Sequence, residues 1–369
     1  MKSNAAVLTK KGAPFEILEV DVKEPGEGEL LVRYVAAGLC HSDLHLMTGN
    51  LTVEYPYIGG HEGAGVVEAV GPGVSRAAVG DHIVCAFIPA CGDCRWCATG
   101  RQSLCDFGAT LMEGCFPDGT YAFSLDGQNA GAMCMLGTFS QYATVRQESV
   151  VKIDPDIPLE VAALCSCGVP TGWGAAVNTG DVQQGDTVLI FGIGGVGANA
   201  VQGAAHAGAT RIIAVDPLPN KREFAKTLGA THAVETAEEG MALAQANPAG
   251  GADVAIVTVD TVVEDVVQVA TAAIRKNGAV VLTALGDPEA LTVHVAGNDL
   301  TVNRKHIKGS LFGDCNPTYD IKRMLDLYRA GKLKLDELIT TKYSLSEINQ
   351  GYADLQAGKN IRGVIVHDS

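Results

Sequence analysis

The chain has 369 residues, and its 42 acidic against 27 basic residues give a formal net charge of −15 at pH 7. This length exceeds the size at which a single hydrophobic core usually stops growing, so two domains are expected. The acidic balance argues against nucleic acid as a partner, because phosphate contacts need a basic face. No apolar stretch is long enough to cross a bilayer, and a soluble protein that binds small molecules is expected.

The first residues and the cysteine content indicate a reducing compartment. Residues 1–8 pass directly into a strand-like pattern, without the apolar region and small-residue cleavage site of a secretory signal. A cytoplasmic location is therefore expected. Eleven cysteines in such a compartment are expected to bind metal rather than to form a disulfide framework.

Residues 1 to about 168 consist of short β-segments, such as 29–35 and 65–70, separated by turns rich in glycine and proline. A mostly β domain is predicted here. From residue 186 the pattern changes to apolar strands that alternate with glycine turns and helices, which predicts βαβ units on a parallel sheet. The predicted strands are 187–191, 212–215, 254–257 and 279–282, and the predicted helices include 198–207, 224–228 and 262–275.

The C-terminal segment carries two helix-like stretches, 321–330 and 345–357, and an apolar strand at 363–366. Because this segment is too small for a core of its own, it is expected to return to the first domain. The predicted domains are therefore 1–168 together with 312–369, and 169–311.

Residues 192–197 read GIGGVG and match the G-x-G-x-x-G pattern between a predicted strand and a predicted helix. Asp216 ends the next strand, nineteen residues after the last glycine. The glycines Gly192, Gly194 and Gly197 allow the backbone to approach a pyrophosphate, and the carboxylate accepts hydrogen bonds from ribose hydroxyls. The charge of Asp216 favours NAD over NADP. Lys221 is either an adenosine contact or an ordinary solvated residue at a helix start.

Four cysteines lie close together in a polar loop with the spacing C-x2-C-x2-C-x7-C: Cys91, Cys94, Cys97 and Cys105. Four thiolates at this spacing can close a tetrahedron around zinc without a position for water, which is typical of a structural site. A nucleic-acid-binding zinc ribbon is disfavoured, because the flanking residues supply only Arg95 and Arg101 as cations.

Three further residues, Cys40, His61 and Cys167, suggest a second metal site. Each alone is a weak signal, because a single cysteine or histidine more often serves packing. Together they would give a Cys2His site with one open position, which distinguishes a catalytic zinc from a structural one.

Residues 60–65 read GHEGAG, followed by Gly71 and Val74, and with these motifs the chain resembles zinc-dependent medium-chain alcohol dehydrogenases over essentially its whole length. The resemblance implies an α/β protein in which a mostly β, GroES-like catalytic domain with a zinc lobe at 91–105 accompanies a Rossmann domain. It further implies two zinc ions per chain, NAD as cofactor, an alcohol or aldehyde as substrate, and a homodimer or higher homo-oligomer.

The resemblance also implies roles for single residues. Ser42 and His45 match a proton relay, Glu62 lies beside the catalytic zinc, Thr171 contacts nicotinamide and Arg362 contacts pyrophosphate. The family frame Cys-Gly-x-x-Thr-Gly selects Cys167 as the ligand and leaves the nearby Cys165 to the core. The positions that match the substrate pocket, which would favour an apolar primary or secondary alcohol or else belong to ordinary core, are Leu51, Phe87, Phe139 and Leu311.

Three short segments indicate the branch of the family, because they resemble actinobacterial nitrosoaniline-dependent dehydrogenases: residues 94–97, 214–217 and 348–353. In that branch NAD(H) stays bound, and an external redox acceptor recycles it. Ala109 and Leu51 stand where glutathione-dependent formaldehyde dehydrogenases carry an arginine and an acid. A thiol-adduct substrate is therefore the alternative and not the main prediction.

Two other classes are weighed against the dehydrogenase. A zinc-free quinone or enoyl reductase on the same fold would not need Cys40, His61 and Cys167, and all three are present. A non-catalytic protein that binds NAD and zinc would not need Ser42 and His45 beside the metal motif. The sequence therefore predicts an NAD-dependent zinc alcohol dehydrogenase.

Overall fold

The computed structural model describes residues 1–260, 264–284 and 293–368, which form two compact units. The first unit consists of Met1–Cys167, Asn316–Gly331 and Leu335–Ser369, and the second of Gly168–Cys315 and Lys332–Lys334. The second crossing between the units lies at residue 315, a few residues after the predicted one. Within the described ranges, no helix has the length and apolar character that spanning a membrane requires.

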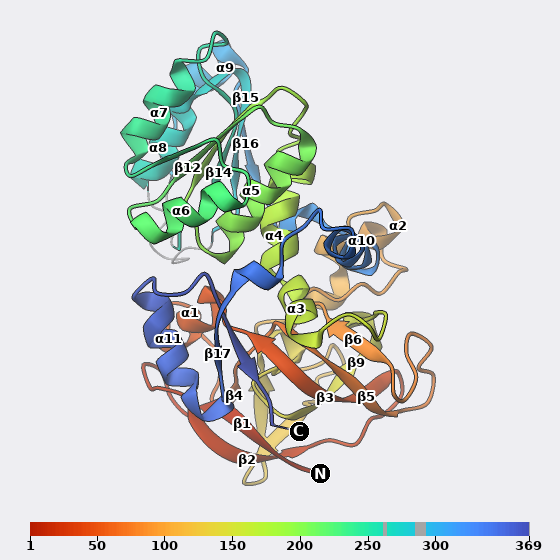
Figure 1. The fold of residues 1–369 in the computed structure, drawn as a ribbon. Coiled ribbons are helices and arrows are strands. Elements are labelled where there is room, and N and C mark those ends of the chain that lie inside the picture. Colours follow the sequence, from red (N-terminus) through yellow and green to blue (C-terminus); the bar gives the residue numbers. More distant parts are fainter. Residues whose placement is uncertain (261–263, 285–292, 369) are drawn as a thin grey trace. The chain divides into compact units, whose positions relative to one another are not determined.

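The first unit is built mainly from β-strands (Figure 1). Its strands are β1 (Lys2–Leu8), β2 (Glu16–Val22), β3 (Glu29–Gly38), β4 (Tyr57–Ile58), β5 (Gly63–Val70), β6 (His82–Cys85), β7 (Phe123–Leu125), β8 (Gln128–Ala132), β9 (Tyr142–Arg146), β10 (Val150–Lys152), β17 (Ile339–Tyr343) and β18 (Arg362–Val366). A closed barrel has the order β1-β2-β7-β8-β4. A seven-stranded sheet has the order β10-β6-β5-β3-β18-β17, with β9 paired to β3.

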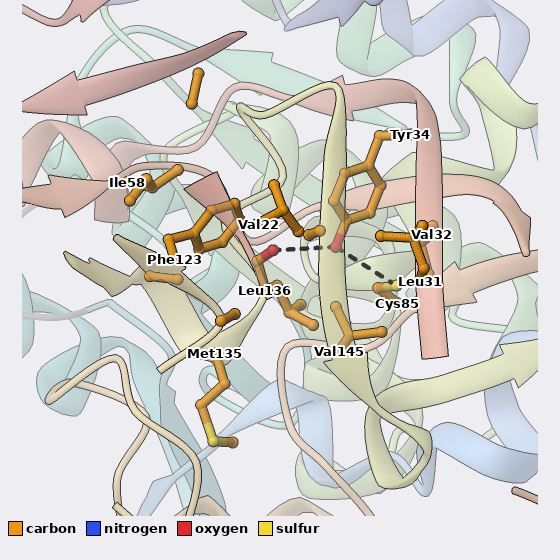
Figure 2. Close-up of a cluster of buried hydrophobic side chains, with 14 of the residues drawn as sticks. Val22, Leu31, Val32, Tyr34, Ile58, Cys85, Phe123, Met135, Leu136 and Val145 are labelled. Carbon is orange, nitrogen blue, oxygen red and sulfur yellow. Dashed lines mark hydrogen bonds between the residues drawn. The ribbon is translucent and has the colours of Figure 1, made fainter. Parts of the chain in front are cut away.

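Strand β3 is central to this sheet because it pairs with β5, β9 and β18. Most of its residues are buried, which explains why its sequence is nearly continuously apolar. Tyr34 on β3 lies among the buried side chains of one core (Figure 2). Its hydroxyl donates to the carbonyl of Leu136 at 3.2 Å and lies 3.7 Å from the sulfur of Cys85, so this buried polar group is satisfied.

The helices of the first unit are short at its N-terminal end and longer at its C-terminal end: α1 (His41–Thr48), α2 (Arg95–Ala98), α3 (Leu159–Ala163), α10 (Pro317–Arg329) and α11 (Ile348–Gln356). Helix α10 begins four residues before the predicted stretch, because Pro317 fits the first helical turn. Helix α11 begins at Ile348 rather than 345, since residues 345–347 form a separate 3-10 turn.

The second unit contains a six-stranded parallel sheet in the order β13-β12-β11-β14-β15-β16 (Figure 1). Its strands are β11 (Thr187–Phe191), β12 (Arg211–Val215), β13 (His232–Val234), β14 (Ala252–Val257), β15 (Ile274–Leu282) and β16 (His306–Gly309). Its helices are α4 (Gly168–Gly174), α5 (Gly195–Ala207), α6 (Pro219–Thr227), α7 (Ala237–Gln245), α8 (Glu264–Ala273) and α9 (Gly297–Asn303). The alternation of parallel strands and helices is the predicted doubly wound arrangement.

Two predicted helices in this unit have wrong bounds. The helix predicted at 224–228 is α6, which begins at Pro219 and ends at Thr227. The helix predicted at 262–275 ends at Ala273, and Ile274 and Arg275 already belong to β15. The strand extends because Ile274 pairs with Ala252, before a register shift around Asn277, whose φ is +61°. Periodicity alone missed this irregular start. The first residues of the predicted helix, 262 and 263, lie outside the described residues.

His367, which follows β18, is a buried imidazole of the first unit. It is 6% exposed, and its Nε2 lies 2.9 Å from the carbonyl oxygen of Thr138. Burial lowers the pKa of His367 to about 4. Because this folded value lies below the unfolded value of about 6.5, the neutral ring contributes stability that is present above pH 6.5. That contribution is lost as the pH falls towards 4.

Replacing His367 by Gln should therefore make stability less sensitive to acid. From the shift to about 4 we expect the wild type to lose about 2 kcal/mol more than H367Q between pH 7 and pH 5. Urea unfolding at both pH values measures this difference. The exposed His306, changed to Gln, is the matched control, and equal acid losses in H367Q and wild type would contradict the prediction.

Candidate metal centres and dinucleotide loop

Four side chains from separate segments of the first unit converge on one buried point. Cys40 precedes α1, His61 and Glu62 lie in the turn before β5, and Cys167 follows the 3-10 turn at 164–166. One ligand atom of each lies within 4.8 Å of the others, and all four residues are buried. Donors bound to one zinc at about 2.0–2.3 Å lie up to about 4.6 Å apart, so this spread is close to that of the ligands of a single ion.

The charges of this cluster depend on one another. The thiol of Cys167 interacts with the sulfur of Cys40, which lowers the pKa of Cys40 well below its usual value and raises that of Cys167. Burial opposes ionisation of His61, but Asp43 and Cys40 together raise the pKa of the imidazole well above its usual value. The two sulfurs thus share negative charge that a bound cation would neutralise.

Asp43 orients His61, and the sequence analysis gave it no role. Its carboxylate is fully buried on α1, with Oδ2 3.0 Å from Nδ1 of His61. Its Oδ1 accepts a hydrogen bond of 2.7 Å from the backbone N–H of Gly60. A carboxylate at Nδ1 leaves Nε2 of the imidazole as the metal-binding atom. The available signal was its place in the first turn of α1, three residues after Cys40.

Glu62 is paired with Arg362 of β18, which contacts its Oε2 through Nη2. Burial raises the pKa of Glu62 to about 8, although Arg362 lowers it. A β-carbon at Gly38 would lie 2.3 Å from the Glu62 carboxylate, so only glycine fits beside this pair. The sequence resemblance implied a pyrophosphate contact for Arg362, whereas here its guanidinium is 5% exposed and bound to a carboxylate.

Ser42 and His45 lie three residues apart on α1, a spacing that places both on one face of the helix. The hydroxyl oxygen of Ser42 is 3.7 Å from the sulfur of Cys40, so it borders the buried cluster. His45 is 7% exposed, and its Nδ1 is 3.2 Å from the side-chain amide nitrogen of Asn50.

The four-cysteine lobe forms a second group of donors within 4.8 Å of one another: Cys91, Cys94, Cys97 and Cys105. Two sulfur pairs, Cys91 with Cys97 and Cys94 with Cys105, are separated by 3.9 and 4.0 Å. Backbone N–H groups donate to the sulfurs, and the N–H of Cys94, for example, donates to Sγ of Cys91 at 3.3 Å. Such donors lower the pKa of Cys94 to about 6, which favours a thiolate.

The glycine-rich loop of the second unit lies between β11 and α5. Gly192 has a φ of +86°, and a β-carbon at Gly197 would lie 1.9 Å from its carbonyl oxygen, so both glycines are required by the turn. Gly194 differs, because a β-carbon there would meet no atom within 4 Å. The turn itself does not require Gly194, and the open space beside it can admit a ligand to the backbone.

Asp216 ends β12 next to this loop. Its Oδ2 accepts from the N–H of Ile193 at 2.7 Å and its Oδ1 from the N–H of Leu218 at 2.9 Å. The carboxylate therefore fixes the loop. Lys221 is half-buried in the first turn of α6. Thr171 on α4 is 9% exposed.

The four residues that match the family's substrate pocket occupy different environments. The ring of Phe87 lies 5.8 Å from that of His61 and packs edge-on against it. Leu51 is partly buried in the same unit. Phe139 is 0% exposed and packs between Phe15 and Tyr352, which is a core position without accessible surface. Leu311 belongs to the second unit and is 42% exposed.

Comparison with known proteins agrees with this architecture. Residues 26–155 match the alcohol dehydrogenase GroES-like domain, and residues 195–330 match the zinc-binding dehydrogenase family. The chain is 58% identical over 370 residues, and over the full length of both proteins, to the NDMA-dependent alcohol dehydrogenase of Amycolatopsis methanolica. The chain belongs to the zinc-binding alcohol dehydrogenases.

Two solved structures extend this likeness to the whole fold. An alcohol dehydrogenase zinc-binding domain protein from Burkholderia ambifaria matches with a TM-score of 0.94 at 34% identity, over 100% of both chains. Benzyl alcohol dehydrogenase from Acinetobacter calcoaceticus matches with a TM-score of 0.93 at 31% identity, also over 100% of both chains. The predicted fold class and the predicted enzyme class, a zinc alcohol dehydrogenase, are confirmed.

Replacing Cys167 by Ala tests the buried donor set of this alcohol dehydrogenase. We expect C167A to contain one zinc ion fewer per chain than the wild type and to lose alcohol oxidation, because two protein donors and a carboxylate hold the ion less tightly. Elemental analysis of the purified protein measures the zinc content.

The neighbouring Cys165 provides the matched control, because it is fully buried two residues away and is not part of the donor cluster. C165A should keep both its zinc content and its activity. Unchanged zinc content in C167A would refute Cys167 as a ligand.

Proposed function

We propose that this chain oxidises an alcohol to an aldehyde or ketone, with zinc at Cys40, His61 and Cys167 and hydride transfer to NAD. The observation that carries the proposal is the buried convergence of these three donors with Glu62 within 4.8 Å. Three protein donors beside a carboxylate leave a coordination position that substrate can take, which is the pattern of a catalytic site.

The donor set fits zinc in both type and environment. Two sulfurs and one imidazole are ligands that zinc prefers, and Asp43 supports the imidazole from behind. When bound there, zinc supplies Lewis acidity, which lowers the pKa of water by about 9 units and acts in the same direction on an alcohol hydroxyl. The protein contributes a dry site, because all four clustered residues are buried.

Ser42 and His45 are proposed to move the alcohol's proton towards solvent. Ser42 borders the cluster at 3.7 Å from Cys40, and His45 lies one turn further along α1. The hydroxyl accepts the proton as it gives up its own, and the imidazole of His45 receives the proton and passes it to solvent.

The second unit is proposed to bind NAD at the glycine loop. The open space at Gly194 and the free N–H groups at the start of α5 suit a pyrophosphate, and the charge of Asp216 disfavours the 2′-phosphate of NADP. Bound NAD supplies the hydride acceptor. Lys221 and Thr171 are proposed contacts for adenosine and nicotinamide. A pyrophosphate contact by Arg362 would require its guanidinium to leave Glu62.

A second zinc ion is proposed in the four-cysteine lobe, where four thiolates fill the coordination shell and give the ion a structural role. We further propose that the protein is a cytoplasmic homodimer. The location follows from the sequence analysis, and the dimer rests on the family resemblance alone.

The proposed substrate is an apolar primary or secondary alcohol, because Phe87 packs against the imidazole of His61. The relative from Acinetobacter calcoaceticus is named for benzyl alcohol, which suits such a wall and serves as a test substrate. The alternative, a thiol-adduct formaldehyde dehydrogenase, is disfavoured because Ala109 offers no charge to a carboxylate-bearing adduct.

We also propose that NAD(H) stays bound and is recycled by an external redox acceptor. The support is the similarity to the alcohol dehydrogenase of Amycolatopsis methanolica, which is named for its dependence on NDMA. Denaturing the purified protein should release about one NAD(H) per chain, and benzyl alcohol should turn over with NDMA but without added NAD. Dependence of the rate on added NAD, together with a nucleotide-free preparation, would contradict retention while leaving the dehydrogenase reaction intact.

The relay is tested by replacing His45 with Gln. We expect H45Q to slow benzyl alcohol oxidation by about 10-fold or more near pH 7, because a positioned proton acceptor is lost, and by less at pH 10, where hydroxide takes its place. The pH profile of kcat/KM measures this. A loss of equal size at all pH values would indicate a structural effect and would remove His45 from the relay.

A further inference from the structure

The turn after α1 returns the chain to His45. Gly49 ends the helix with a φ of +78°, and its N–H donates to the carbonyl of Leu46 at 3.2 Å. The positive φ requires glycine at this position, and the side-chain carbons of the exposed Lys11 cover it. The N–H of Leu51 then donates to the carbonyl of His45 at 3.0 Å and closes the turn. Asn50 is thereby fixed beside the imidazole.

The contact between these two side chains has a definite polarity. The amide nitrogen of Asn50 lies 3.2 Å from Nδ1 of His45, and an amide N–H can only donate. With the amide placed in this way Nδ1 accepts, which corresponds to the neutral imidazole with its proton on Nε2. His45 is 7% exposed while Asn50 is exposed, so an exposed amide lies at the Nδ1 edge of an almost buried ring.

We propose that Asn50 is the positioning residue of His45, which holds the imidazole in place and selects the tautomer with the proton on Nε2. This inference rests on the proposed function, in which His45 passes the alcohol's proton to solvent. In that tautomer the electron pair that can take up a proton lies on Nδ1, so the N–H of Asn50 must give way when a proton arrives. The protonated ring donates from both nitrogens, so the Asn50 amide must then turn and present its oxygen.

The charged groups around this turn do not replace Asn50 in that role. Asp43 on the same helix has its two carboxylate oxygens directed at Gly60 and His61. Lys11 packs with its side-chain carbons against Gly49.

Two substitutions of Asn50 should change the tautomer of His45 in different ways. N50A removes the donor, so both tautomers of His45 should become populated. N50D provides only acceptors, so the proton should move to Nδ1, and the introduced negative charge should favour the protonated ring. T52A, two residues further in the same exposed loop, is the matched control and should leave His45 as in the wild type.

Nuclear magnetic resonance of the zinc-loaded protein with isotope-labelled histidine reports both properties directly. The His45 signals are assigned by their absence in H45Q, and the ring nitrogen shifts identify the tautomer while a pH titration gives the pKa. The proposal is upheld by an Nε2–H tautomer in the wild type, a mixture in N50A and an Nδ1–H tautomer in N50D. The same tautomer and the same titration in all three proteins would overturn it.

Benzyl alcohol oxidation separates this proposal from the relay. The acidic limb of the kcat/KM profile should move to higher pH in N50D by as much as the pKa of His45, because only the neutral ring accepts a proton. If H45Q alters the profile and neither Asn50 variant does, the role of Asn50 is refuted and the relay stands. If H45Q retains the wild-type profile, the relay is refuted, and with it any part of Asn50 in catalysis.

Discussion

The burial of several ionisable groups at one point is the constraint on which the first unit depends. Burial costs an ionised side chain several kcal/mol of hydration free energy, and a partner group must compensate this cost. Here Asp43 is compensated by His61 and by a backbone N–H, and Glu62 by Arg362. The sulfurs of Cys40 and Cys167 share a proton, and His61 further stabilises the thiolate of Cys40. A divalent cation is the partner that would allow both sulfurs to be thiolates.

The backbone around the cluster is fixed by bonds that involve no ligand. Ser166 accepts from the N–H of Gly63 at 3.0 Å and donates to the carbonyl of Cys85 at 2.7 Å. One hydroxyl thus ties the segment that carries Cys167 to β5 and β6, beside the turn that carries His61. Because the distant segments are joined by buried hydrogen bonds, the donors are held together before any metal arrives, which reduces the ordering cost of binding.

The sequence predicted most of the fold, because its signals are local. A buried strand, a G-x-G-x-x-G turn and closely spaced cysteines are each readable from a short window, and the structure has the corresponding β11, the loop at Gly192 and the lobe at 91–105. What it missed depends on tertiary contacts. The early start of β15 needs the neighbouring Ala252, and the pairing of Arg362 with Glu62 joins residues 300 positions apart.

The side chains beside the cluster were harder to assign, for the same reason. Phe139 matches a pocket position by family frame, but its packing between two other rings leaves it no accessible surface. Asp43 and Asn50 belong to residue types that are common at helix starts and in turns, so nothing local distinguishes them. Only the short distances from their side chains to imidazole nitrogens distinguish them from other residues of these types.

Asp43 and Asn50 give two imidazoles different properties, that of His61 before β5 and that of His45 on α1. The carboxylate of Asp43 faces Nδ1 of His61 and can only accept, so the proton stays on Nδ1 and the free electron pair on Nε2 is available to a metal. The amide nitrogen of Asn50 faces Nδ1 of His45 and can only donate, so the free pair lies on Nδ1 itself. The imidazole of His61 is thus suited to binding a metal, and the imidazole of His45 is suited to taking up a proton. Because both partners lie on or directly after one short helix, the placement of α1 determines both.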